Sequence, residues 1–261
     1  MISNYINTDI KSGIKTGLVV SILAVLSACS SSSSSTSDAT RVEISAAPLP
    51  ANAATMPAGA KTFTNDLNDS ITINTAYLVI SSVTIETECD ASFSAALDGL
   101  LNLIIPAAHA HTESTPTSTG APHVIDLLAV DGGDIEIGEL SPPTGDFCGA
   151  DIDMLAADAD AENLPAGAGD PDMIGKTVYV EGTYDVGALP FTISSGVTLI
   201  NRELLLSALM IIDKDDSEGT IDLAINYDTW FDAVDMAMLA AGDAGELNAV
   251  LQNVTNSIHQ R

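Results

Sequence analysis

The segment from Ser70 to Cys89 constrains the fold of this chain more than any other. It is rich in β-branched residues that alternate with a period of two, most clearly at Val83, Ile85 and Thr87. β-branched side chains fit the pleated surface of a sheet, and successive side chains of a strand point to opposite faces. The segment therefore predicts two strands, or one bent strand, in a sheet that buries one face.

Shorter segments of the same kind follow, and turn residues separate them. We expect strands at residues 134–140, 146–155, 177–184 and 190–195, and a hairpin formed by residues 204–212 and 220–227. Short and frequent strands with turn signals between them are typical of an antiparallel sandwich. The predicted fold is therefore mainly β, an antiparallel β-sandwich.

Three segments have helical spacing instead. Apolar residues recur every three or four positions in residues 92–105 until Pro106, which predicts a short amphipathic helix. Asp228 is a candidate cap of a helix that extends to Met238, and residues 247–258 predict a second helix. We expect these short C-terminal helices to pack on the sheet or to close one end of the sandwich.

The N-terminal segment has the layout of a secretory signal. Lys11 and Lys15 precede an uncharged apolar run, residues 16–28, which is too short to cross a bilayer as a helix. The run ends in Leu-Ser-Ala before Cys29, and this resembles the bacterial lipoprotein box, in which the cysteine carries the lipid. Because Ser30 rather than Asp follows, the resemblance to lipoprotein sorting rules favours the outer membrane. A buried free thiol in an N-terminal helix is the alternative, which the signal layout disfavours.

These features predict three parts of the chain. Residues 1–28 are interpreted as a lipoprotein signal peptide and residues 29–60 as a lipid-anchored flexible tether, because a Ser homopolymer and Ala/Pro-rich text do not bury enough surface to order themselves. Residues 61–261 are expected to form the β-sandwich domain with C-terminal helices. Within the tether, apolar and polar residues alternate from Arg41 to Ser45, and this segment is a candidate edge strand.

The charge of the chain limits its partners. It has 36 acidic and 8 basic residues and a formal net charge of −28. Such a charge repels phosphate backbones and anionic lipid, so we expect no nucleic-acid partner. It also attracts cations and keeps a surface protein soluble. Secreted proteins from saline habitats carry similar surfaces, so the charge by itself identifies no ligand.

The three cysteines have two predicted roles, one as the lipidated residue and two as a pair. With Cys29 taken by lipid, Cys89 and Cys148 remain as an even pair in an oxidising compartment. A disulfide between them closes a loop of about 60 residues, which is worth about 4 kcal/mol in the chain-entropy model. A metal-thiolate pair is the competing interpretation, but the chain lacks a C-x-x-C motif, which favours the disulfide.

Three of the four histidines lie close together in the sequence, and they are the candidate metal ligands. His109 and His111 are two residues apart, so on an extended segment both imidazoles point to the same side. His123 follows after a loop rich in Thr, Ser and Pro. Three neutral imidazoles suit copper or zinc, and a periplasmic location favours copper. The alternative is that they are solvated loop residues, or packing residues held by hydrogen bonds.

Two segments resemble known bacterial proteins. The segment from Ala108 to Leu128 resembles the sequences of a group of uncharacterised bacterial lipoproteins. The segment from Ile225 to Asp235 is similar to the C-terminal sequence of the MbnP-like family of periplasmic copper-associated proteins. That family implies a β-sandwich and copper bound by histidines. In some members a modified tryptophan lies near the metal and a di-haem partner protein performs the oxidation. Trp230 is the single tryptophan here, and a core or hinge aromatic is its alternative interpretation.

Two acidic segments are weaker candidates. In residues 213–222, an EF-hand aligned on Gly219 has Lys214 at position one and Ile225 at position twelve, where Asp and a bidentate Glu are needed. The segment is therefore not an EF-hand, and the two interpretations left for it are a looser surface calcium site and a charged hairpin tip. A second cluster is interpreted as a solvated face; it comprises Asp151, Asp153, Asp158, Asp160 and Glu162.

The chain carries no signature of an enzyme. It has no G-x-S-x-G, H-E-x-x-H or C-x-x-C-H motif, and neither a P-loop nor a dinucleotide-binding fingerprint. The leading hypothesis is therefore a non-catalytic outer-membrane lipoprotein that binds copper through His109, His111 and His123, with a possible redox partner protein. The alternative is a structural or interaction lipoprotein without a ligand. Calcium-dependent adhesion or glycan binding is a third hypothesis.

Overall fold

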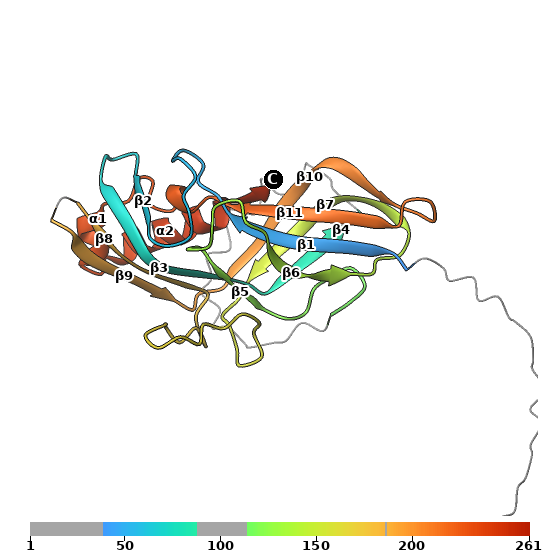
Figure 1. Ribbon diagram of the computed structural model, residues 1–261, viewed down its shortest axis with the longest axis horizontal. Coiled ribbons are helices and arrows are strands. Elements are labelled where there is room, and N and C mark those ends of the chain that lie inside the picture. The colour runs from blue at the N-terminus through green and yellow to red at the C-terminus, as the bar shows by residue number, and fades with distance from the viewer. Residues whose placement is uncertain (1–38, 88–113, 186) are drawn as a thin grey trace, which may run out of the picture. The chain divides into compact units, whose positions relative to one another are not determined.

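The structure is a computed structural model, and it describes residues 39–87, 114–185 and 187–261. All of these residues belong to one compact unit. Their strands form a β-sandwich with two short helices near the C-terminus (Figure 1). The predicted fold class is therefore confirmed.

The first sheet has the strand order β12-β11-β1-β6. Strand β1 (Arg41–Pro48) lies in its interior, parallel to β11 (Glu218–Ile225) and antiparallel to β6 (Ile135–Leu140). The short strand β12 (Ile258–Gln260) extends the sheet beyond β11. Strands from the two ends of the chain thus pair directly.

The position of β1 corrects the predicted tether. The residues from Arg41 onward are not a flexible spacer, and Arg41–Pro48 is not an edge strand, because Val42, Ile44 and Ala46 are fully buried in the core. Small and β-branched side chains fit this interior position between two other strands. The local alternation predicted a strand at Arg41 to Ser45, but it could not predict the interior position, because the partner strand β11 lies more than 170 residues away in the sequence.

The second sheet contains β10, β7 and β4. Strand β7 (Gly145–Met154) is the middle strand, antiparallel to both β10 (Leu199–Ile212) and β4 (Ser82–Glu86). The sequence predicted a hairpin of the strands now called β10 and β11, and this is wrong. The turn at residues 213–217 joins strands of two different sheets, because each of them pairs with a strand distant in the sequence.

The third sheet has the order β2-β3-β8-β9, comprising β2 (Lys61–Thr64), β3 (Ser70–Ile80), β8 (Val178–Tyr184) and β9 (Leu189–Ser195). Strand β5 (His123–Asp126) pairs with the last residues of β3. Between β3 and β4, the backbone N–H and the hydroxyl of Ser81 both donate to Asp153 O, at 2.8 and 2.7 Å. The predicted bent strand thus passes from the third sheet to the second at Ser81.

The C-terminal helices differ in part from the prediction. The helix α2 (Ala244–Asn256) is confirmed, and Asp243 caps it. The expected helix from Asp228 is only a 3-10 turn (Tyr227–Thr229), and α1 (Met236–Ala240) begins after Asp235, whose carboxylate accepts two backbone N–H bonds. The positive φ of Ala233 interrupts the earlier helix.

One hydrophobic core joins the three sheets and the helices. Buried side chains from β1, β3, β7, β8 and β11 meet Tyr227, Trp230 and Phe231, and α2 adds Val250 and Val254. Among the described residues, no helix combines the length and the apolar character that crossing a membrane requires.

Candidate functional site

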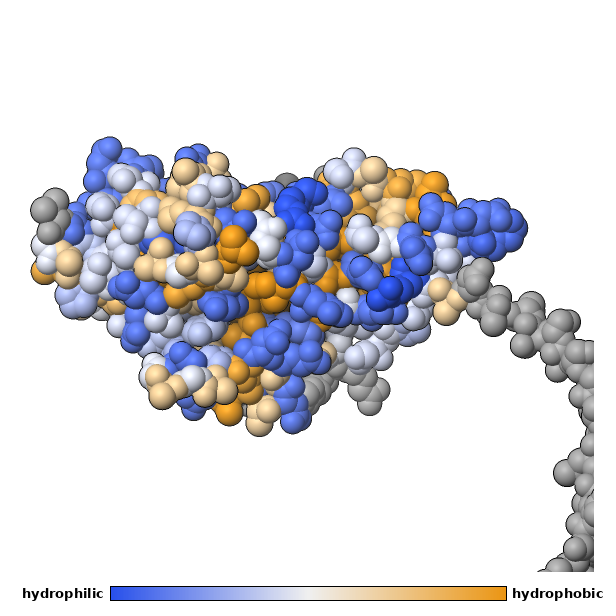
Figure 2. Space-filling view, in the orientation of Figure 1, coloured by the Kyte–Doolittle hydropathy of each residue, from blue (hydrophilic) through white to orange (hydrophobic). Residues whose placement is uncertain are grey.

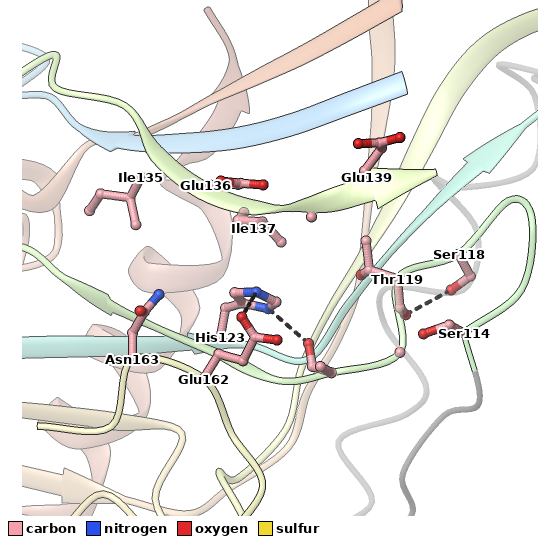
Figure 3. Close-up of a pocket in the computed structure, with 13 residues that line it drawn as sticks. Ser114, Ser118, Thr119, His123, Ile135, Glu136, Ile137, Glu139, Glu162 and Asn163 are labelled. Atoms are coloured by element: carbon pink, nitrogen blue, oxygen red, sulfur yellow. Dashed lines mark hydrogen bonds and ion pairs between the residues drawn. The ribbon is translucent and has the colours of Figure 1, made fainter. Parts of the chain in front are cut away.

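A pocket of about 520 Å³ lies where β5 begins. Its walls are β6, the loop that leads into β5, and the loop around residue 162 (Figure 3). The side chains that give it chemical character are His123 and three carboxylates, Glu136, Glu139 and Glu162. It is the place in the described structure where a sequence-predicted metal ligand faces open space.

Backbone pairing fixes the positions of His123 and Glu162. His123 is the first residue of β5 and pairs with Ile80 of β3. On its other side it forms a parallel bridge with Glu162, where Val124 N donates to Glu162 O at 3.0 Å and Glu162 N donates to Pro122 O at 2.8 Å. The two residues, 39 positions apart, are therefore held side by side by their main chains.

The imidazole of His123 has a partner at each nitrogen. Its side chain is buried, with 6% of the residue exposed, and Nδ1 lies 2.9 Å from Ala121 O. Because a carbonyl oxygen only accepts, this contact is a hydrogen bond when Nδ1 carries a proton, and in that neutral tautomer the lone pair is on Nε2. Nε2 lies 3.1 Å from Glu162 Oε2. Figure 3 shows the Glu162 carboxylate pointing at the ring from the neighbouring loop.

In the tautomer with its single proton on Nδ1, two acceptor atoms are in contact. A carboxylate oxygen and an unprotonated imidazole nitrogen repel each other at 3.1 Å unless a positive charge lies between them. A second proton on the ring satisfies this requirement and gives an imidazolium-carboxylate pair. A metal ion bound by both groups also satisfies it, and Glu162 has the freedom to adjust because its side chain is 61% exposed.

The opposite wall of the pocket carries further negative charge. Glu136 and Glu139 extend from β6, and Glu139 pairs with Arg41 Nε at 2.7 Å. The loop that forms the floor is pinned by Thr119, whose hydroxyl accepts the backbone N–H of Val83 at 2.9 Å. The site is thus built on strands and on a loop that is fixed to a strand, and Glu136 adds a carboxylate to that of Glu162.

The other predicted metal ligands lie outside the described residues. This applies to His109 and His111, and to the predicted helix at residues 92–105. Within residues 39–87, 114–185 and 187–261, no group of three or more His, Cys, Asp or Glu side chains is arranged to hold a metal ion. His123 and Glu162 are therefore at most part of a metal site, and convergence of the three histidines stays a prediction.

The predicted disulfide and lipid anchor stay predictions as well, because Cys29 and Cys89 lie outside the described residues. Cys148 lies on β7, and its Sγ is 3.7 Å from Glu86 O at the end of β4. Since Cys89 follows Glu86 by three residues, the chain is long enough to bring the two cysteines together.

Trp230 is a core residue. It is fully buried, its Nε1 donates to Ser257 Oγ at 2.8 Å, and Asn253 donates to its carbonyl oxygen at 3.1 Å. These contacts fix the ring between the 3-10 turn and the end of α2. They account for the residue as a packing aromatic, which was its alternative interpretation.

The acidic cluster predicted as a solvated face is divided by the fold. Asp151 and Asp153 lie on β7, where burial, together with the hydrogen bond and charge of Glu86, raises the pKa of Asp151 to about 7. Glu162 instead faces His123, and no sequence pattern connects these two residues. The acidic segment that begins at Asp213 is a charged turn. The Asp213 carboxylate accepts the backbone N–H groups of Asp215 and Asp216, and these bonds lower the pKa of Asp213.

Comparison with known proteins gives no match. No family model, no curated protein sequence and no solved structure is similar to this chain.

Proposed function

We propose that the protein is a lipid-anchored outer-membrane protein that binds a metal ion, preferably copper, without catalysis. The observation that carries the proposal is the contact of 3.1 Å between His123 Nε2 and Glu162 Oε2, in a ring whose Nδ1 is held by Ala121 O. A histidine that binds a metal through Nε2 commonly donates its other N–H to a carbonyl oxygen, which fixes the tautomer. His123 already has this arrangement.

The remaining ligands of the proposed site are His109 and His111. Two imidazoles on an H-x-H segment and a third on β5 make a nitrogen-rich donor set, which suits copper better than the oxygen ligands that calcium and magnesium require. Glu162 supplies a carboxylate beside the third imidazole. The net charge of −28 raises the local concentration of cations around such a site.

The sequence resemblance to MbnP-like proteins supports copper as the metal and a redox protein as the partner. The proposed location is the periplasmic or outward face of the outer membrane, with Cys29 as the lipidated residue and Cys89–Cys148 as a disulfide. An oxidising compartment is compatible with both cysteine assignments. A second candidate function, an interaction lipoprotein without a ligand, is favoured by the exposed apolar side chains of β10.

Copper retention tests the proposal. The mature chain is loaded with copper, desalted and analysed for metal beside the triple variant His109→Ala/His111→Ala/His123→Ala. We expect about one copper per chain in the parent, none in the triple variant, and weaker retention in Glu162→Gln. His259→Ala is the matched control, because His259 lies on β12 and contacts Ser257 O. Equal retention by all four proteins would mean that the acidic surface holds copper nonspecifically, and would reject the proposal.

A further inference from the structure

Strand β10 presents an apolar surface to solvent. Leu205, Leu209 and Ile211 have 55%, 53% and 49% of their surface exposed, and they form the largest group of exposed hydrophobic side chains on any described strand. The segment from Leu204 to Ile212 contains no charged residue, in a chain with a net charge of −28. Figure 2 shows hydrophobic residues gathered over β10 at the upper right. A patch of this kind in a soluble domain marks an interaction surface.

The backbone of this strand is not arranged to add another strand. β10 pairs with β7 along one edge, and the register shifts between Leu205 and Met210, which marks an irregular, bulged stretch. On the other side, Ser207 N donates to the side-chain oxygen of Gln260 at 2.5 Å. Bulges and side-chain caps are devices that protect an edge from strand addition. What β10 offers is therefore its side chains rather than a backbone template.

The apolar surface lies near the point where the N-terminal segment joins the sandwich. Arg41, the first residue of β1, donates its backbone N–H to Ser217 O at 2.8 Å, in the turn that follows β10. Eleven residues lie between Cys29 and Arg41, so twelve residue-to-residue steps join them. A chain of this length spans at most about 43 Å when fully extended. A lipid on Cys29 would therefore keep this end of the sandwich close to the membrane surface.

The charge of the chain selects among apolar partners. A second copy would bring another net charge of −28 toward the first, and anionic lipid would be repelled in the same way. The turn beside the surface adds Asp213, Asp215 and Asp216 against one cation, Lys214, which pairs with Asp215. A zwitterionic lipid surface presents an apolar phase without this repulsion. Leu and Ile side chains that enter the headgroup boundary gain apolar burial there.

We infer that Leu205, Leu209 and Ile211 form a membrane-docking face that seats the domain on zwitterionic lipid. The inference goes beyond the metal site and does not depend on it. It uses the proposed lipid at Cys29 for one purpose, which is to explain why the membrane is close to this surface. In the docked state these side chains lie at the headgroup and acyl boundary, and the carboxylates of the neighbouring turn stay in water.

Quenching by brominated lipid tests the inference. The lipidated protein is reconstituted in phosphatidylcholine vesicles with and without bromine on the acyl chains, as the Leu209→Trp variant. The matched control is Val197→Trp, because Val197 is 45% exposed and lies in the loop between β9 and β10, twelve positions before Leu209. Trp230 is fully buried and gives the same background in both variants. We expect at least two-fold greater quenching in Leu209→Trp than in Val197→Trp, whereas equal quenching would overturn the inference.

Two further measurements separate this inference from the proposed anchor. The intact mass of the mature chain reports acylation of Cys29, so a missing lipid is detected independently of quenching. If the lipid is missing, preferential quenching of Leu209→Trp with added vesicles still supports the docking face, and its absence rejects that face. The oligomeric state of Cys29→Ala in solution tests the competing occupant. We expect a monomer, and a dimer that Leu209→Glu dissociates would assign the surface to a second copy and overturn the inference.

Discussion

Lys61 Nζ lies 2.9 Å from Asp131 Oδ1, and neither side chain is exposed to solvent. The ammonium group also donates to Pro57 O at 2.9 Å and to Ala129 O at 2.7 Å. The second carboxylate oxygen of Asp131 accepts a bond from Tyr227 Oη at 2.9 Å. This network joins three segments that are distant in the sequence.

Removal of the ammonium group leaves Asp131 buried without its counter-charge. We expect Lys61→Met to lower the free energy of unfolding by about 3–5 kcal/mol, the usual cost of breaking one half of a buried pair. Urea unfolding measures the change. Lys214→Met is the control and should stay within about 0.5 kcal/mol of the parent, because its side chain is solvent-exposed. A loss below about 1 kcal/mol in Lys61→Met would contradict the role given to the pair.

Asp228 binds the segment that follows β1. Its carboxylate accepts the backbone N–H groups of Ala51, Asn52 and Ala53 at 2.7, 2.8 and 3.0 Å. Asparagine has a single acceptor oxygen, so we expect Asp228→Asn to cost about 3 kcal/mol. Hydrogen exchange should also accelerate at these three amides. Asp185→Asn is an exposed control, and unchanged exchange at residues 51–53 in Asp228→Asn would count against the anchoring.

The pH dependence of stability should carry a contribution from Asp151. Burial, with the hydrogen bond and charge of Glu86, raises its pKa to about 7 in the folded state, compared with about 3.9 in an unfolded chain. Between these values the folded state binds more protons than the unfolded state. The stabilisation from this group is therefore complete below about pH 4 and declines as the pH rises to about 7.

The variant Asp151→Asn mimics the protonated carboxyl at every pH. We expect it to be more stable than the parent at pH 8 and to differ little from it near pH 4, as measured by urea midpoints. Asp146→Asn, an exposed position on the same strand, is the matched control. An Asp151→Asn effect of equal size at both pH values would show that the carboxyl is not held protonated by the fold.

The sequence could predict where strands lie and which of their residues face the core, because the alternation of β-branched residues is a local signal. This applies to Val83 and Ile85 on β4 as much as to the alternating start of β1. Which strands pair was not accessible, since β1 and β11 are joined by contacts more than 170 residues apart. For the same reason the composition of residues 41–60 suggested a tether, although Asp228 and Lys61 fix this segment.

Of the two residues in contact at the candidate site, His123 and Glu162, the sequence predicted only His123 as a site residue. His123 was singled out because of its neighbours in the sequence, whereas Glu162 was assigned to a solvated face. Their contact depends on a bridge between β5 and a loop 39 residues further on, and no spacing rule encodes such a bridge. The burial of Trp230 follows from packing against the end of α2, which a single tryptophan in the sequence does not reveal.

Electron paramagnetic resonance of the protein with one equivalent of Cu(II) tests the central claim most directly. Coupling from imidazole nitrogen identifies histidine ligands, and the spectrum is recorded for the parent, His123→Ala and His259→Ala. The account predicts imidazole coupling in the parent and in His259→Ala, and a weaker or altered signal in His123→Ala. The same spectrum from all three proteins would show that His123 does not bind copper, and would contradict the account.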